Sequence, residues 1–478
     1  MTCRIRQSLY VLIGLLIAVV ALLAMTALGG PHTATVHAAP PANAALTSPT
    51  AMGAIAYLYN NSTEIRLVEA DGTNDRLLWR APNPELHRIG NVAWSPDGTR
   101  LAFSSDHETV CSLFRSDLYT IKPDGTDLQR VTNAPACSEL ATYSKGSVTI
   151  DVENQLTESI YFIYVEGAPE AQEVIINPAT KKRIIIANVA DFGDGVQQRV
   201  VIFQTEQNSW IYPTAVVDVL PNAMATAGDF TISNSNKFSF YGAYSPSWRR
   251  DSQAIGFALG AVSAYQVAAN PGIGAHGEAL FSEGSHFATS VALSPLDDRV
   301  LLFSYPYMSL GTVGNSESVA RVVEFSGDLY GVDWLADGSG LVAGEVAGFE
   351  TKYANLFTYT YGESNVQHLT NYESEFAADP SVSPDGTELV FIYAPTIDAD
   401  AELQIMNIDG SNVRSLGVKG IHPDWGMPSQ AAQPTPTPTV MPTVTPTSTG
   451  TPQATVTPTA TRDPAPATDA VYLPYVQQ

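Results

Sequence analysis

The chain has 478 residues, of which 45% are hydrophobic and 15% are charged, so it can bury at least one large core and has room for two domains. Its 24 Lys and Arg residues against 48 Asp and Glu residues give a formal net charge of −24, and the basic cluster Lys181 to Arg183 is short. Because such a charge repels phosphate backbones, we expect no nucleic-acid partner.

The N-terminus has the features of a secretory signal. Arg4 and Arg6 precede an apolar run over residues 9–28, and a Val-His-Ala pattern follows at residues 36–38. We expect a signal peptide over residues 1–38, cleaved after Ala38, and export of the rest of the chain. The apolar run is nearly long enough to cross a bilayer, so an uncleaved membrane anchor stays open as the alternative.

A short pattern recurs through the body of the chain. Trp94 is followed by "SPDGTRLAF", Trp248 by "RRDSQAIGF", Trp334 by "LADGSGLVA" and Val382 by "SPDGTELVF", with a weaker copy after Leu293. The repeated unit is a strand that ends in an aromatic or apolar residue, followed by a polar turn and a second apolar strand.

Each unit predicts four antiparallel strands joined by hairpins, which is the composition of a propeller blade. The Asp-Gly pairs occur where such hairpins need them, because Asp bonds to its own backbone and Gly tolerates positive φ. We assign this turn role to Asp97–Gly98, Asp124–Gly125, Asp337–Gly338, Asp385–Gly386 and Asp409–Gly410. Trp94, Trp248, Trp334 and Trp425 are assigned to blade packing rather than to a carbohydrate platform.

The two ends of the repeat region complement each other. Residues 421–426, "IHPDWG", form a first strand without continuation, whereas "GAIAYLY" from Gly53 lacks a first strand. Trp425 matches Trp94, and Ile55 matches Leu101, so one blade combines both ends and closes the ring. The expected fold is all-β: a six-bladed β-propeller of four-stranded blades closed by N- and C-terminal strands, with an inserted small β-sandwich-like domain.

The repeat resembles the TolB-type, WD-like β-propeller repeat. The resemblance rests on Ser95 to Phe103, on Leu118 and Tyr119, and on Val131 and Thr132, and it covers most of residues 52–426 apart from the insert. It implies the propeller fold and does not carry over a role in the Tol–Pal system, because no α/β domain precedes the blades.

The distance between Trp94 and Trp248 leaves about 100 residues beyond one blade, enough for a small domain. We divide the body into a first propeller segment (52–137), an inserted β-rich domain (138–236) and a second propeller segment (237–426). Cys3 leaves with the signal, so Cys111 and Cys137 remain as a pair that we expect to form a disulfide worth about 3 kcal/mol at the root of the insert. The insert is expected to cover some of the central channel.

The C-terminal region has a different composition. Residues 427–469 are rich in Pro and Thr and predict a disordered stalk, and residues 470–478 form an apolar tail that ends in "VYLPYVQQ". The tail resembles a short terminal motif of some bacterial surface proteins, while a disordered end with chance hydrophobicity is the alternative. The order of signal, body, stalk and tail is typical of a protein displayed on a bacterial cell surface.

No residue pattern for catalysis stands out. The chain has no Gly-x-Ser-x-Gly elbow, and the string "GNSES" at Gly314 lacks the second glycine. The repeated Asp97, Asp251, Asp337 and Asp385 could in principle converge as glycosidase acids, but hairpin geometry already explains their spacing. We therefore assign no catalytic residue.

Metal sites are weakly indicated at most. Asp398, Asp400 and Glu402 offer oxygen ligands at alternate positions, as calcium loops do, but a solvated acidic loop is the favoured interpretation. Asp191 and Asp194 are assigned to a turn. His276, Glu278 and His286 do not follow a zinc motif and are assigned to the surface. No cofactor is expected, apart from structural calcium as a weak candidate.

The sequence predicts a secreted, surface-associated binding or scaffold protein that engages an extracellular or envelope protein, peptide or cell-wall glycan. Contact with a membrane is expected only through an uncleaved N-terminal segment or the C-terminal tail. The alternative is an extracellular polysaccharide hydrolase or lyase with acids at the channel. A self-associating surface-layer element is the third hypothesis.

Overall fold

A computed structural model describes residues 53–426, except 194, 205–209, 240–241, 261–262, 282–287, 305, 325–326, 328, 347–352 and 364–365. Apart from two short 3-10 helices, η1 (Thr109–Cys111) and η2 (Cys137–Thr142), every regular element within these ranges is a strand. The predicted all-β class is therefore confirmed. No helix in the described ranges is long and apolar enough to span a bilayer, and the expected signal, stalk and tail lie outside these ranges.

Three four-stranded antiparallel sheets are each made from one stretch of chain. Blade 1 contains β4 (Ile89–Trp94), β5 (Leu101–Ser105), β6 (Asp117–Ile121) and β7 (Gln129–Arg130). Blade 2 contains β16 (Ala243–Trp248), β17 (Ala254–Leu259), β18 (Ser263–Ala268) and β19 (Glu278–Ala279). Blade 3 contains β20 (Ser290–Leu293), β21 (Arg299–Ser304), β22 (Tyr307–Thr312) and β23 (Asn315–Glu324).

The next two units are joined into one eight-stranded sheet by a single bridge between Ala354 and Phe376. Blade 4 contains β24 (Leu329–Trp334), β25 (Gly340–Val346), β26 (Ala354–Thr360) and β27 (Gln367–His368). Blade 5 contains β28 (Phe376–Val382), β29 (Glu388–Ala394), β30 (Glu402–Asn407) and β31 (Arg414–Lys419). In blades 1 to 5 the first strand in the chain lies at an edge of its blade, and contacts between successive first strands place them on the inside of the ring.

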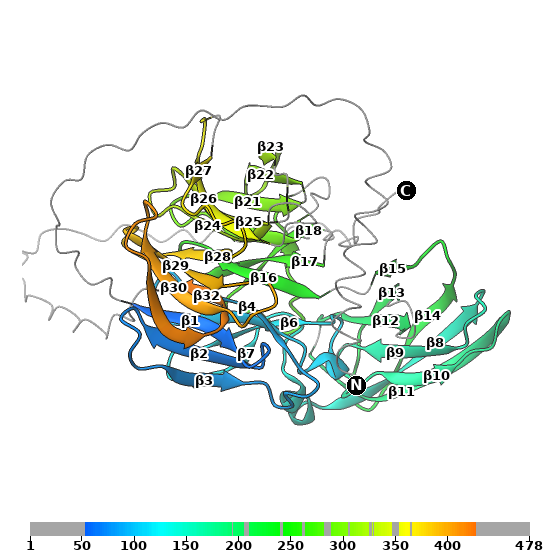
Figure 1. Ribbon diagram of the computed structural model, residues 1–478. Coiled ribbons are helices and arrows are strands. Elements are labelled where there is room, and N and C mark those ends of the chain that lie inside the picture. The colour runs from blue at the N-terminus through cyan, green and yellow to red at the C-terminus, as the bar shows by residue number, and fades with distance from the viewer. Residues whose placement is uncertain are drawn as a thin grey trace, which may run out of the picture. The chain divides into compact units, whose positions relative to one another are not determined.

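The closing blade combines both ends of the described chain. Strand β32 (Ile421–Trp425) pairs with β1 (Ala54–Tyr59), which is followed by β2 (Glu64–Glu69) and β3 (Arg76–Arg80). Figure 1 shows this as an orange strand lying beside a blue one. Ile55 pairs with Trp425 as Leu101 pairs with Trp94 in blade 1, so the predicted closure is confirmed down to its register.

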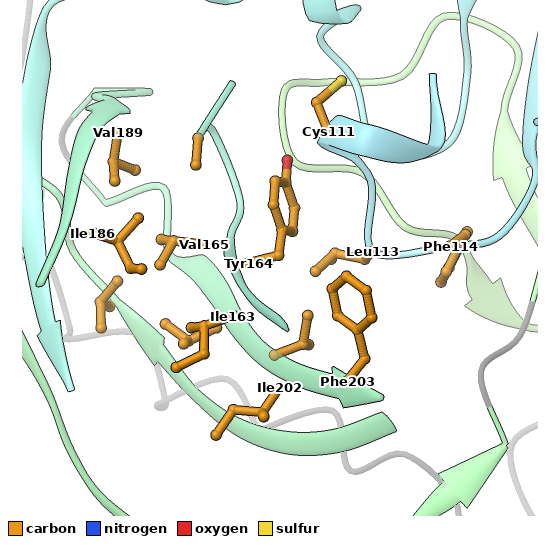
Figure 2. Close-up of a cluster of buried hydrophobic side chains, with 14 of the residues drawn as sticks. Cys111, Leu113, Phe114, Ile163, Tyr164, Val165, Ile186, Val189, Ile202 and Phe203 are labelled. Atoms are coloured by element: carbon orange, nitrogen blue, oxygen red, sulfur yellow. The ribbon is translucent and has the colours of Figure 1, made fainter. Parts of the chain in front are cut away.

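The insert consists of two further sheets. One has the order β10-β9-β12-β13-β15 and the other β11-β8-β14. Their bounds are β8 (Lys145–Asn154), β9 (Ile160–Val165), β10 (Gln172–Ile175), β11 (Thr180–Ala190), β12 (Gln198–Gln204), β13 (Trp210–Val217), β14 (Met224–Ile232) and β15 (Phe238–Ser239). Strand β15 pairs with β13, although the sequence assigned its residues to the second propeller segment (237–426). Strand β8 alternates between buried and partly exposed residues, as expected for a strand that packs on one face only. Figure 2 shows Ile163, Ile186 and Ile202 of the two sheets pointing toward one another.

The insert root joins blade 1 to the insert. Its residues are Glu108, Asp117, Arg130, Asn133 and the disulfide between Cys111 and Cys137, which confirms the predicted pair. Arg130 has a fully buried side chain and donates to Asp117 at 2.7 Å. Asp117 also accepts from Asn133 at 2.6 Å. The buried charges at this point are therefore matched by fixed partners.

A histidine extends this network from the propeller into the insert. His276 Nδ1 lies 2.8 Å from Asn133 Oδ1, and its Nε2 lies 3.2 Å from Glu166 Oε1 in the insert. Backbone bonds from Asn133 to Ala275 and from Gly274 to Ala134 run beside it. His276 was expected at the surface, but its side chain is only 9% exposed.

Candidate functional site: the central channel

A cavity of about 390 Å³ lies among the inner strands of the propeller. Its lining comes from β4, β16, β20, β24, β28 and β32 and from the residues that directly follow them. No described residue of the insert contributes to this lining, although the sequence led us to expect the insert as a partial cover of the channel.

Bulges at the beginning of the inner strands shape this lining. The pairing register shifts in five inner strands, between Ile89 and Val92, Tyr244 and Ser247, Leu329 and Val332, Ala378 and Ser381, and at the matching point of β32. The inner strand of blade 3, β20, pairs with β21 without a shift. Since a bulge inserts an unpaired residue and re-aims side chains, the lining residues at these points are set by backbone geometry.

Three of the bulge residues have a left-handed backbone directly before a proline. The φ angles are +50° for Ser245, +56° for Asp379 and +51° for His422, and residues 246, 380 and 423 are prolines. Non-glycine residues rarely adopt this conformation, and the residue before a proline favours the extended region instead. Strain of this kind is retained where surrounding structure enforces it, which is frequent at functional sites.

The charge of the lining is one-sided. Its titratable side chains are Asp333, Asp379, His422 and Asp424, which belong to blades 4 and 5 and to the closing blade. Blades 1, 2 and 3 contribute neutral residues such as Asn91 and Ser245, and the described lining contains no Lys or Arg. Three carboxyl groups therefore share one enclosed space with a single imidazole.

This enclosure shifts the pKa values of three of these side chains. Burial, together with repulsion from Asp333, raises the pKa of Asp424 to about 7, although the backbone N–H of Trp94 works in the opposite direction. Burial also raises the pKa of Asp333 to about 6. Burial alone would lower the pKa of His422, but the Asp379 carboxylate, 2.7 Å from its Nδ1, outweighs this and holds that pKa above its usual value.

A hydrogen bond crosses every seam between neighbouring blades. At two seams a tryptophan indole donates it: Trp248 Nε1 to the carbonyl oxygen of Ala93 at 3.0 Å, and Trp334 Nε1 to that of Ala292 at 2.9 Å. The indole nitrogens of Trp94 and Trp425 have no partner among the described residues. All four tryptophans are buried, as expected of blade-packing residues.

At the other four seams a side chain accepts the bond from the next blade's backbone. The accepting residue occupies the position of Ala93 and Ala292, directly before the tryptophan position. The pairs are Ser247 with Leu293 (2.8 Å), Asp333 with Val382 (2.8 Å), Ser381 with Trp425 (3.0 Å) and Asp424 with Trp94 (2.6 Å). Alanine cannot accept in this way, which explains why the indole bond replaces it at the remaining seams.

The structure places the Asp-Gly pairs in hairpin turns, away from the channel. Asp97 accepts from Ser95 Oγ (2.7 Å) and from the backbone N–H of Thr99 (3.0 Å), and Gly98 has a φ of +67°. Asp124, Asp337, Asp385 and Asp409 likewise accept from the backbone N–H two residues on. Asp251 does the same at the matching turn of blade 2. The repeated aspartates therefore stabilise turns and do not converge.

The weak metal candidates are not brought together. Asp400 pairs with Lys419 at 2.9 Å and Glu402 accepts from Gln404 at 2.7 Å, and neither contacts Asp398 in a shared site. Asp191 accepts from Gly193 in a turn, whereas Asp194 and His286 lie outside the described residues. Within the described ranges, no three His, Cys, Asp or Glu side chains are grouped as a metal ion requires.

Two of the three residues in the short basic cluster form ion pairs within the insert. Lys181 pairs with Asp229 at 2.9 Å and Arg183 pairs with Asp151 at 2.7 Å. Lys182 donates to the carbonyl oxygen of Ile175 at 2.9 Å.

Sequence reasoning did not identify the channel acids. A signal was present, because Ser245, Asp379 and His422 all precede a proline two residues before the end of an inner strand. To infer that these residues face the channel, one must know that the inner strand has a bulge at this point, and residue propensities do not predict that bulge. Asp333 and Asp424 carry no motif beyond their position directly before a tryptophan.

The strand order and the central cavity define the class as an all-β propeller with an inserted β-domain. No protein-family model matches the chain. Among solved structures, the chain is similar to TolB from Acinetobacter baumannii, with 14% identity over 80% of this chain and 68% of that chain and a TM-score of 0.44. It is also similar to a chain of the nidogen/laminin complex, with 7% identity over 78% of this chain and 93% of that chain and a TM-score of 0.39. For a prolyl endopeptidase the identity is 9% over 80% of this chain and 51% of that chain, and the TM-score is 0.35. The assignment of the fold rests on the strand pairing described above.

Proposed function

We propose that the protein is an exported, surface-held binding protein whose channel receives a positively charged group of a protein or peptide partner. The observation that carries this proposal is the composition of the lining, where Asp333, Asp379 and Asp424 face a cavity without Lys or Arg. Enclosed carboxylates without a fixed cation are costly, and a cation that enters the cavity offsets this cost.

The scaffold supports this role. The ring is closed by strand pairing between β1 and β32, and each seam has its own hydrogen bond, so the channel is held by a preorganised framework. A rigid site loses little freedom on binding, which favours affinity. The signal pattern, the stalk and the tail of the sequence support display outside the cell.

Affinity capture tests the proposal. The full chain is immobilised and exposed to envelope and culture extracts beside an Asp333→Asn/Asp424→Asn variant, in which two amides replace carboxyl groups of nearly the same shape. We expect a protein partner to be retained by the wild type and reduced at least tenfold on the variant.

A second variant, in which a short Gly/Ser link replaces residues 138–236, separates the channel from the insert. If the partner is lost only from this variant, the insert is the binding surface and the channel proposal is wrong. Equal capture by all three proteins also contradicts the proposal. A retained glycan in place of a protein shifts the partner class but keeps the channel as the site.

One observation favours a second candidate, an extracellular polysaccharide hydrolase or lyase. The raised pKa values of Asp333 and Asp424, about 6 and about 7, are suited to general acid catalysis near neutral pH. However, both carboxyl groups accept backbone hydrogen bonds across seams, which assigns them a structural task already. Reducing-end release from a panel of polysaccharides, measured for the wild type and the Asp333→Asn/Asp424→Asn variant, distinguishes the candidates.

A further inference from the structure

Strand β32 is held in the ring by strand pairing and by side-chain contacts across two seams. It is the last described strand, it adds to β1 as the inner strand of the closing blade, and it borders β28 on one side and β4 on the other. Within the described ranges, no further strand of its own blade follows β32. Its place in the ring depends on the chain link to β31 (Arg414–Lys419), on pairing with β1 and on contacts across two seams.

Three residues make the titratable contacts across these seams. His422 donates to Asp379 Oδ2 twice, from its backbone N–H at 2.9 Å and from Nδ1 at 2.7 Å. Asp424 Oδ2 accepts from the backbone N–H of Trp94 at 2.6 Å. The first contact joins β32 to blade 5 and the second joins it to blade 1, so both seams of the strand contain groups that exchange protons.

The geometry of the first contact is enforced. Both His422 and Asp379 have left-handed φ angles of +51° and +56°, and each precedes a proline. The two strained bulges bring the imidazole and the carboxyl group together across the seam. A conformation of this kind persists only while its surroundings hold it, so a weaker contact favours release of the strand.

The three enclosed groups with a raised pKa respond to protons in the same direction. For Asp424 and Asp333 the folded pKa lies above the unfolded value, so their contribution to stability is present at low pH and is lost as the pH rises toward about 7 and about 6. The pKa of His422 is also raised, so its favourable pairing with Asp379 is lost as the pH rises above that value. Ionisation strengthens the bond that Asp424 accepts from Trp94, but it also sets Asp424 against the carboxylates of Asp333 and Asp379 just as His422 loses its charge. Rising pH therefore loosens the strand through repulsion between carboxylates and through the loss of the His422–Asp379 ion pair.

The other elements packed against β32 do not reverse this sign. Strand β4 has no titratable side chain and contributes Asn91, 3.3 Å from His422 Nδ1. The titratable groups of the remaining neighbours have partners of their own. These are Glu388 with Arg414, Glu402 with Gln404, Tyr57 with Asp75, Tyr59 under Arg66 and Tyr393 against Tyr372.

We propose that Asp379, His422 and Asp424 form a proton-operated clasp that holds β32 in the ring, tight in mild acid and loosened at alkaline pH. Loosening opens the seams beside the closing blade and thereby exposes the channel from its side. The clasp does not depend on the proposed binding role, because it concerns the ring itself.

Hydrogen exchange of the full chain tests the clasp without any ligand. Exchange is measured by mass spectrometry at pH 5.5 and pH 8.0 and corrected for the intrinsic rate at each pH. We expect peptides from β32 and β1 to open at least tenfold more often at pH 8.0. Peptides from β20 and β21 serve as an internal control, because Ser247 at their seam does not titrate, and their opening is expected to stay constant.

Two substitutions sharpen the test. Asp424→Asn keeps an acceptor oxygen for Trp94 and removes the proton exchange, so it is expected to reduce the pH dependence of β32. His422→Gln removes the other titrating partner and is expected to do the same. The matched control Ser247→Ala loosens its own seam by the same factor at both pH values.

Opening of β32 in the wild type that is independent of pH overturns the proposal, whether or not the variants fold. Unchanged pH dependence in both folded variants overturns it as well. Failure of a partner to bind in the capture experiment does not change the hydrogen-exchange result, so the clasp and the proposed function are tested independently.

Discussion

The insert root and the channel both enclose carboxyl groups, but only the root supplies a permanent cation. Asp117 is fully buried and lies 2.7 Å from Arg130, which has no exposed side-chain surface. In the channel, Asp333 and Asp424 have no cationic side chain in the lining beyond the titratable His422. A buried carboxylate paired with a permanent cation serves structure, whereas an enclosed carboxyl group without such a cation can still exchange a proton.

The largest expected loss of stability comes from removing the cation of the insert root. Arg130→Met removes the cation and leaves Asp117 buried without it, so the free energy of unfolding is expected to fall by about 3–5 kcal/mol. Urea denaturation followed by tryptophan fluorescence measures this loss. The control Arg183→Gln removes an exposed arginine that also pairs with an aspartate, and it is expected to change nothing measurable.

If Arg130→Met and Arg183→Gln have equal effects, burial does not determine the value of these pairs, and the contrast between root and channel is wrong. A double variant, Arg130→Met/Asp117→Leu, refines the result. It replaces both charges by apolar groups and is expected to recover some of the lost stability, because no uncompensated charge then remains.

The disulfide gives the next largest effect. Cys137→Ser opens the 26-residue separation between the cysteines and is expected to lower the stability by about 3 kcal/mol, because the unfolded chain gains freedom. Differential scanning calorimetry under oxidising conditions measures the shift. Reduction of the wild type by dithiothreitol is expected to produce a similar shift, and no shift in either experiment contradicts a structural role of the bond.

The two types of tryptophan at the seams allow a smaller, matched test. Trp334→Phe removes the indole donor to Ala292, whereas Trp94→Phe removes an indole nitrogen without a described partner. Both lose the same volume, so we expect Trp334→Phe to cost about 1 kcal/mol more in the free energy of unfolding. Equal losses in chemical denaturation show that the indole bonds do not matter for the seams.

Much of the fold follows from the sequence, because a propeller repeats local rules. Trp94, the Asp97 turn and Leu101 predict one hairpin, and the repetition of this pattern predicts the ring. The pairing of Trp425 with Ile55 could be aligned in advance because both residues match their counterparts in blade 1. The disulfide was predicted because Cys111 and Cys137 are the two cysteines outside the expected signal peptide.

The site could not be predicted in the same way. Its acids occupy positions that differ between blades, Asp333 and Asp424 before a tryptophan and Asp379 before a proline, so no repeat links them. Their convergence depends on the bulges and on ring closure, which are long-range features. The sequence drew attention to the repeated turn aspartates instead, which the structure explains by local backbone bonds.

The most direct test of the contrast is the pH dependence of the free energy of unfolding for the wild type and the Asp333→Asn/Asp424→Asn variant. Because the folded pKa values of both carboxyl groups are raised, to about 6 and about 7, the wild type is expected to lose stability relative to the variant as the pH rises from 4 to 8. A difference that stays constant over this range would show that the channel acids are as fully compensated as those of the insert root, and it would contradict the account.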